Sequence, residues 1–179
     1  MDALQLLLRR NSSPKLTEPA PSGADLETMF QAALRAPDHA RLRPWRFLVI
    51  EGEARHRLGD LIVDVMGLEG EKAQQAKAKP LRAPMIVVVA AKFSEHPKVP
   101  EIEQYLSAGC AAHNLLLAAE ALGYAGIWRT GSITFAPGLW SGLGLEEDER
   151  PVGFIYLGTR AGAPKPLPEL ETRDYVRHW

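Results

Sequence analysis

The sequence has almost no cysteine, no excess of either charge and no long apolar run. Its single cysteine, Cys110, excludes an internal disulfide and every zinc site that needs two or more thiolates. Lys and Arg number 21 against 22 Asp and Glu, so the formal net charge of -1 argues against holding nucleic acid by charge. The longest strongly apolar runs, 85–91 and 115–122, are far shorter than the roughly 20 residues of a membrane span. We therefore expect neither a nucleic acid nor a membrane as a partner.

The rest of the composition is that of an ordinary globular protein. The chain has 179 residues, of which 46% are hydrophobic and 24% charged, and it contains no repeat or linker. We expect a single domain over residues 1–179. The basic pair Arg9 and Arg10 follows the first apolar stretch, the reverse of a secretory signal, so the expected location is cytoplasmic. The five histidines are scattered, without two at metal-ligand spacing beside a carboxylate, and we expect no metal site.

Hydrophobic periodicity and the positions of proline and glycine predict a mixture of helices and strands without regular βαβ spacing. Expected helices cover 2–10, 25–36, 53–66, 71–79 and 101–122, with a helical turn at 136–143. Expected strands cover 46–51, 85–92, 126–130 and 152–158. The continuously apolar run at 85–92 indicates a strand in the middle of the sheet, covered on both faces.

The expected helix over 101–122 is apolar or small around nearly its whole circumference. In a chain of this size, such a helix needs a second subunit to cover it. Cys110 and His113 lie three residues apart on this helix, which could indicate a nucleophile pair, but the small apolar neighbours favour a core position for Cys110. The proline-rich tail from residue 161 predicts an extended arm that docks elsewhere.

Three segments combine residues suited to binding a ligand. Arginines and hydroxyls at 9–13 suit a phosphate monoester, although the basic residues could instead answer the helix dipole. The segment 35–46 is dense in proline, arginine and tryptophan and suits a planar heteroaromatic ligand, or forms a rigid surface turn. In 122–131, glycines permit close backbone approach to a ligand and Arg129 adds a fixed charge, while Gly123 also fits a helix C-cap.

In this order and spacing, the segments resemble the nitroreductase family of FMN-dependent oxidoreductases, especially its small, minimal NAD(P)H nitroreductases. The resemblance extends over nearly the whole chain. It is carried by Arg10-Asn-Ser12, by Arg35-Ala-Pro-Asp-His39 leading into Pro44-Trp45, by the helix end 118–123, by Gly126-Ile-Trp-Arg-Thr-Gly131 and by Gly153-Phe-Ile-Tyr-Leu-Gly158.

The resemblance implies an α+β fold, with a central mixed β-sheet flanked by helices, and a homodimer with two FMN sites at the subunit interface. One subunit would hold the FMN phosphate and ribityl chain through Arg10, Asn11 and Ser12. The other subunit would reach the same flavin through Arg35 and His39. Trp128, Arg129 and Thr130 would complete the site. NADH or NADPH would bind near Ala118, Ala119, Glu120, Ala121, Leu122 and Gly123.

The chain departs from the family pattern at several basic positions. Asn11 stands where many relatives have a second arginine, and Pro14 lies where a basic residue is usual slightly downstream, with Lys15 as a substitute. The Lys-x-Arg phosphate clamp of larger relatives is absent as such, and Arg160 and Lys165 are candidates to replace it. The charge near the flavin pyrimidine therefore has no assigned source in the sequence.

The implied activity is hydride transfer from NADH or NADPH, through flavin N5, to an electron-poor small molecule such as a nitroaromatic or a quinone. No catalytic side chain is then required, since the flavin carries the chemistry. The alternative is an FMN-binding protein with a storage, sensing or interaction role and no turnover. Both functions need the same binding residues, so the sequence does not separate them.

Overall fold

The computed structural model describes residues 2–179 and contains one five-stranded sheet. The strands are β1 (Leu16–Thr17), β2 (Trp45–Glu51), β3 (Met85–Lys92), β4 (Ala125–Arg129) and β5 (Glu149–Arg160). The order runs β2-β3-β5, β4 lies along β5, and β1 pairs with the C-terminal end of β5. The expected strands are all present, and the sequence reading missed β1.

The sheet is antiparallel in every strand pair between residues 2 and 179, which corrects the expected mixed sheet. The connection between β2 and β3 shows the physical reason. Glu51, the last residue of β2, lies opposite Met85, the first residue of β3. The helices between these strands therefore return the chain to the same end of the sheet at which it left, which makes the two strands antiparallel.

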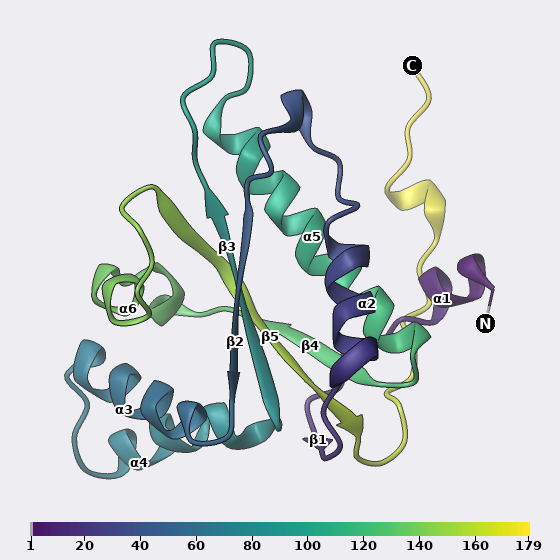
Figure 1. Ribbon diagram of the computed structural model, residues 1–179. Coiled ribbons are helices and arrows are strands. Elements are labelled where there is room, and N and C mark those ends of the chain that lie inside the picture. The colour runs from purple at the N-terminus through teal and green to yellow at the C-terminus, as the bar shows by residue number, and fades with distance from the viewer. Residues whose placement is uncertain (1) are drawn as a thin grey trace.

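Helices cover both faces of the sheet (Figure 1). Helices α2 (Gly23–Ala33) and α5 (Glu101–Ala121) pack on one face. Helices α3 (Ala54–Met66), α4 (Gly70–Ala78) and α6 (Pro137–Gly142) lie on the other. Short 3-10 turns, η1 (His39–Arg41), η2 (Pro80–Arg82), η3 (Ser132–Phe135) and η4 (Thr172–Asp174), connect the larger elements or interrupt the tail. The short α1 (Ala3–Arg9) lies beside the C-terminal tail. The α+β class is confirmed.

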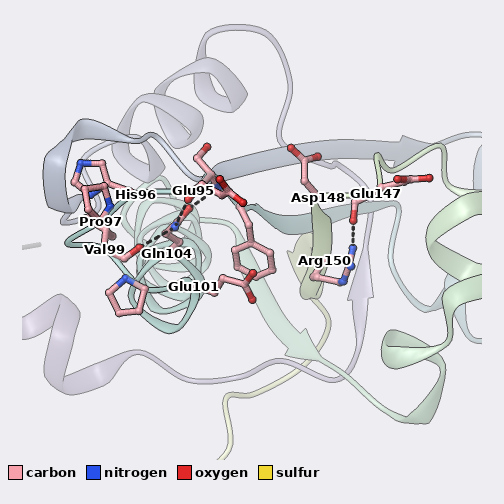
Figure 2. Close-up of a pocket in the computed structure, with 12 residues that line it drawn as sticks. Glu95, His96, Pro97, Val99, Glu101, Gln104, Glu147, Asp148 and Arg150 are labelled. Atoms are coloured by element: carbon pink, nitrogen blue, oxygen red, sulfur yellow. Dashed lines mark hydrogen bonds between the residues drawn. The ribbon is translucent and has the colours of Figure 1, made fainter.

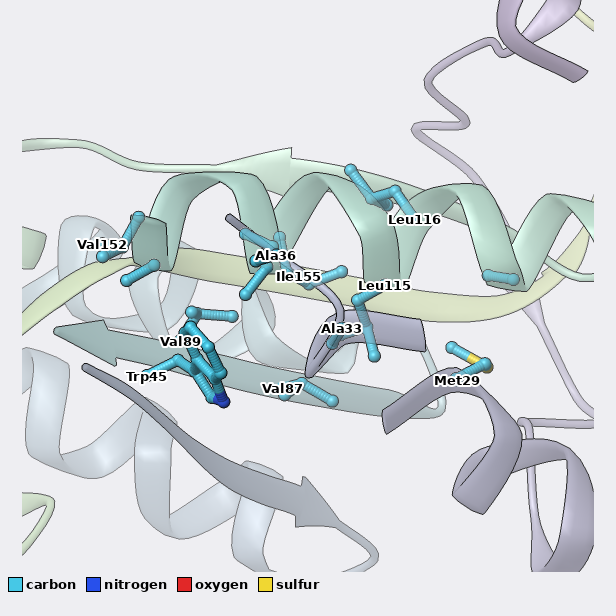
Figure 3. Packing of buried hydrophobic residues seen from close by; sticks show 14 of the residues in the cluster. Met29, Ala33, Ala36, Trp45, Val87, Val89, Leu115, Leu116, Val152 and Ile155 are labelled. Atoms are coloured by element: carbon cyan, nitrogen blue, oxygen red, sulfur yellow. The ribbon is translucent and has the colours of Figure 1, made fainter. Parts of the chain in front are cut away.

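Strand β3 is the centre of the core, as its apolar run predicts. All but its last residue are buried. Val87 and Val89 face the core formed with α2 and α5, which Figure 3 shows together with Leu115 and Met29. The alternate residues of the strand, such as Val88, point to the other face and join the second core beneath α3. This alternation follows from the period of two in a strand.

Helix α5 packs one face against the sheet and leaves another uncovered. Ala108, Ala111 and Leu115 are fully buried, whereas Ile102 and Leu106 are 61% and 60% exposed. Cys110 is also exposed, because it points away from the buried stripe, so the expectation of a core cysteine is wrong. Within residues 2–179, no helix is both long enough and apolar enough to cross a membrane.

Candidate active site

The N-terminal loop, residues 10–13, leaves the end of α1 and is fastened to the start of β4. The Ser13 N–H donates to the Gly126 carbonyl oxygen at 3.0 Å, and Ser13 is buried. The loop therefore has a fixed position on the edge strand. Arg10, Asn11 and Ser12 are half-buried, and Arg10 Nη1 lies 3.5 Å from Ser12 Oγ. The guanidinium and hydroxyl expected to bind phosphate are thus neighbours.

The three expected site residues at the end of β4 lie on different sides of the sheet. A Cβ added to Gly153 would overlap the Trp128 indole nitrogen, and one added to Gly109 would lie 3.8 Å from its ring. Trp128 is therefore packed between β5 and α5, where Gly153 leaves room for it. Arg129 points to the opposite face, as alternation along a strand requires. Thr130, just beyond the strand, is exposed.

The Arg129 guanidinium lies over the Tyr156 ring, with its central carbon 5.5 Å from the ring centroid. Its Nε is buried and has no hydrogen-bond partner among residues 2–179. A buried N–H without an acceptor costs about 1–3 kcal/mol, which a ligand oxygen or nitrogen at this place would recover. Burial raises the pKa of Tyr156, against the opposing effect of Arg129 and then Arg82. The Tyr156 phenol therefore stays protonated, and the guanidinium lies over an uncharged aromatic ring.

Arg129 and Thr130 border a cavity of about 320 Å³, here named the cationic cavity. Its apolar floor comes from α3 and β5, with Leu58, Ile62 and Phe154 among the residues. Three cations line it, and its lining contains no carboxylate. The full lining is Leu58, Ile62, Met66, Leu68, Lys79, Arg82, Arg129, Thr130, Gly131, Ser132, Ile133, Phe154 and Tyr156. An apolar slot with convergent cations suits a planar ring whose edge carries negative charge.

Lys79 and Arg82 are cavity residues that the sequence reading missed. The lysines of α4 look like a solvated face, and Lys79 ends that run. The available signal is that Lys79 and Arg82 flank Pro80 and Leu81 shortly before the buried strand β3. The sequence alone does not show that these two residues lie near Arg129. That depends on the strand order, in which β3 lies next to β5 and β5 lies next to β4. These two residues are candidates for the missing charge near the pyrimidine.

The segment from Arg35 to His39 packs along the N-terminal half of α5. His39 Nδ1 is 2.7 Å from Glu103 Oε2 in the first turn of that helix. Ser107 Oγ donates to the Pro37 carbonyl oxygen at 2.6 Å and holds the same turn. The Asp38 carboxylate accepts the backbone N–H groups of Leu42 and Arg43. These bonds fix a loop in which Ala40, Arg41 and Arg43 have positive φ angles of 60°, 57° and 52°.

The N-terminal loop lies near the opposite end of α5, because Arg160 contacts both Asn11 and Glu120. Glu103 and Glu120 are about 26 Å apart along the helix at 1.5 Å per residue. Within one chain, therefore, the structure does not bring His39 to the side of Arg10 and Ser12. Arg35 lies nearer the middle of α5, because Ser107 contacts Pro37 and Asn114 Nδ2 donates to the Ala32 carbonyl oxygen.

The expected nicotinamide segment, 118–123, is the end of α5. Gly123 has a φ of 89°, and its N–H donates to the Glu120 carbonyl oxygen. The Tyr124 N–H donates to the Ala119 carbonyl oxygen, which completes a Schellman cap. Ala119 is fully buried, whereas Ala121, Leu122 and Gly123 are exposed. The exposed turn leaves backbone available to a ligand.

A second, larger cavity of about 760 Å³ lies between the β3–α5 loop and the start of β5 (Figure 2). Glu95, Glu101, Glu147 and Asp148 give it an acidic lining. Gln104, which is 2% exposed, is already bonded to the backbone of Ser94 and Val99. In the part of the chain described, His, Cys, Asp and Glu form no group of three suited to a metal ion.

Comparison with known proteins agrees with the fold. The model of the Nitroreductase family matches residues 7–159. The "Putative NAD(P)H nitroreductase YdjA" of Escherichia coli K12 is 44% identical over 162 residues, covering 89% of this chain and 88% of the relative. The "Putative NAD(P)H nitroreductase" of Haemophilus influenzae is 40% identical over 183 residues, covering 99% of this chain and 100% of the relative.

Solved structures share the fold at lower sequence identity. A nitroreductase-like protein from Bacillus cereus superposes with a TM-score of 0.84 at 23% identity, covering 100% of this chain and 96% of that protein. A nitroreductase from Desulfovibrio desulfuricans, solved in complex with FMN, has a TM-score of 0.76 at 22% identity, covering 99% of this chain and 98% of that protein. From the family match and the two relatives of 40% identity or more, this chain belongs to the nitroreductase family.

Proposed function

We propose that this protein is an FMN-dependent oxidoreductase that takes hydride from NADH or NADPH and reduces an electron-poor small molecule, such as a nitroaromatic or a quinone. Family membership and relatives named as NAD(P)H nitroreductases support the oxidoreductase class. FMN in a structurally similar nitroreductase supports the cofactor. The observation that carries the proposal is the cationic cavity, at one end of the strand that anchors the N-terminal loop, where Arg129 Nε has no partner among residues 2–179.

The residues of one subunit fit the two charged regions of FMN. Arg10 and Ser12 would hold the phosphate, because a guanidinium and a hydroxyl supply several matched donors, and Asn11 would contact the ribityl chain. Arg129, with Lys79 and Arg82, would place positive charge near the pyrimidine ring. Bound at these residues, FMN would supply two-electron hydride transfer between the nicotinamide and the acceptor. Thr130 would complete the ring site, while the Trp128 side chain, packed on the opposite face of the sheet, would support the strand that carries Arg129.

The protein then needs to orient its ligands and supply charge, without a side-chain acid or base. Tyr156, the titratable group beneath Arg129, has a pKa raised by burial and holds its proton. Cations held near the pyrimidine ring would favour the reduced flavin, because they would offset the negative charge that reduction adds to the ring. The exposed end of α5, residues 118–123, would meet the nicotinamide.

We propose that the active form is a homodimer with shared sites. The uncovered face of α5, with Ile102 and Leu106 mostly exposed, needs a second copy to bury it. Because His39 lies at the opposite end of α5 from the N-terminal loop, we propose that Arg35 and His39 reach the flavin of the partner. Tyr175, at 72% exposed, and Trp179 leave the C-terminal arm with apolar groups to dock on that copy.

Steady-state kinetics test the proposed order of reaction. Because one flavin face cannot hold the nicotinamide and the acceptor together, the two substrates should react in turn. Initial rates at several fixed acceptor concentrations should give parallel double-reciprocal lines in NADH or NADPH. Intersecting lines would indicate a ternary complex and a different site.

The identity of the cofactor is tested separately. Heating the protein should release FMN, identified by its mass, and release of FAD would contradict the assignment.

A further inference from the structure

Arg160 and Glu120 form a partly buried ion pair next to the N-terminal loop. Arg160 Nη2 lies 3.1 Å from both Glu120 carboxylate oxygens, and the side chains are 18% and 20% exposed. The same nitrogen lies 3.5 Å from the Asn11 carbonyl oxygen. Asn11 in turn donates through Nδ2 to the Lys165 carbonyl oxygen. The pair is therefore part of the framework that holds the N-terminal loop.

This arrangement differs from an ordinary surface ion pair. Surface pairs contribute little because water screens both partners, whereas these two side chains are largely withdrawn from water. Arg160 is needed to neutralise Glu120, and Glu120 is needed to neutralise Arg160. A phosphate monoester bound at Arg10 and Ser12 would attract the Arg160 guanidinium and repel the Glu120 carboxylate.

We propose that Arg160 contributes to binding the FMN phosphate and that Glu120 is its internal counter-ion, which limits the affinity of the loop for a phosphate monoester. This inference rests on the proposed function, in which the N-terminal loop holds the FMN phosphate. Glu120 is a positioning residue in this account, since it acts through Arg160. Its carboxylate is engaged with Arg160, on the inner side of the segment expected to meet the nicotinamide.

The ratio of two dissociation constants isolates the phosphate contribution. FMN and riboflavin share the ring and ribityl chain, and only FMN carries the phosphate. Both constants are to be measured by flavin fluorescence on full-length apoprotein of the wild type, Glu120→Gln and Arg160→Gln. Asp60→Asn is the matched control, because Asp60 forms an exposed ion pair with Lys77 between α3 and α4.

Opposite shifts are expected in the two site variants. Glu120→Gln removes the repelling charge and should raise the preference for FMN over riboflavin by about threefold to tenfold. Arg160→Gln removes a charged donor and should lower that preference by about tenfold. Asp60→Asn should leave the ratio unchanged. Arg160→Lys, which keeps the charge, should fall between the wild type and Arg160→Gln.

The same measurements distinguish the possible failures. If Glu120→Gln and Arg160→Gln lose thermal stability but keep the wild-type ratio, the pair is only structural and the inference is overturned. If Arg160→Gln does not fold, the ratio in Glu120→Gln decides, because a decrease or no change would also overturn it. If the wild-type protein binds neither flavin, the proposed function itself fails.

Discussion

Arg10 is the single residue whose proposed role is most easily separated from a structural one. It caps α1, so its charge could simply answer the helix dipole. If it binds phosphate, Arg10→Ala should weaken FMN binding by about 1.5 to 3 kcal/mol, the range for a hydrogen bond to a charged group. Flavin fluorescence titration measures this change. Arg57→Ala, at an exposed position on α3, is the control. An unchanged FMN affinity in Arg10→Ala would show that Arg10 only interacts with the helix dipole.

Arg129 should affect the reduction potential of bound FMN. Arg129→Met keeps an apolar stem over Tyr156 and removes the positive charge from the cationic cavity. The reduced flavin then loses a stabilising charge, and the potential should become more negative by roughly 30 mV, equivalent to about 1.4 kcal/mol for two electrons. A redox titration beside Arg57→Met measures the shift. A potential equal to that of the wild type would place the flavin away from Arg129.

The N-terminal loop and the end of β4 were singled out from the sequence by their residue types, and their part in binding FMN stays a prediction. Lys79 and Arg82 were not found, because their part in the site depends on strand order, which local pattern does not contain. The position of Cys110 was predicted wrongly for a related reason. Its neighbours 108, 109, 111 and 112 are small and mostly buried, but a helix places residue 110 on the opposite side from 108 and 112.

At the scale of elements, the uncovered face of α5 is the surface through which we expect the protein to dimerise. Leu106→Glu places a charge on its uncovered face and should prevent dimerisation. FMN should also be lost, since Arg35 and His39 of a second copy would no longer reach it. Gln74→Glu adds the same charge at an exposed position on α4 and should change neither property. Sedimentation velocity and flavin content measure both. A Leu106→Glu dimer with full FMN would show that another surface forms the interface.

Most elements could be predicted because their signals are local. The run at 85–92 matches β3, and Gly123 ends α5 as its left-handed conformation suggests. The 12-residue length of β5 was underestimated because its first residues, Glu149 and Arg150, are charged. Their strand conformation is fixed by pairing with β3. The two-residue β1 exists only because it pairs with the end of β5.

At the scale of the whole molecule, shared sites predict that two variants with impaired FMN binding complement each other. Arg10→Ala and Arg35→Ala disable opposite halves of each site in the proposed dimer. A mixed dimer would have one doubly damaged site and one intact site. Random association gives about half mixed dimers, so co-refolding should recover roughly a quarter of wild-type sites. FMN content and activity measure the recovery. Dimers without complementation would place both arginines in one subunit's site.

The central claim is that bound FMN is reduced by a nicotinamide and reoxidised by a small acceptor. The most direct measurement is the visible spectrum of the flavin-loaded protein without oxygen. Addition of NADH or NADPH should remove the yellow absorbance of oxidised FMN, and a nitroaromatic or a quinone should restore it. If the spectrum stays oxidised with an excess of both nicotinamides, the protein holds flavin without turnover, as in a storage or sensing role, and the proposed oxidoreductase activity is wrong.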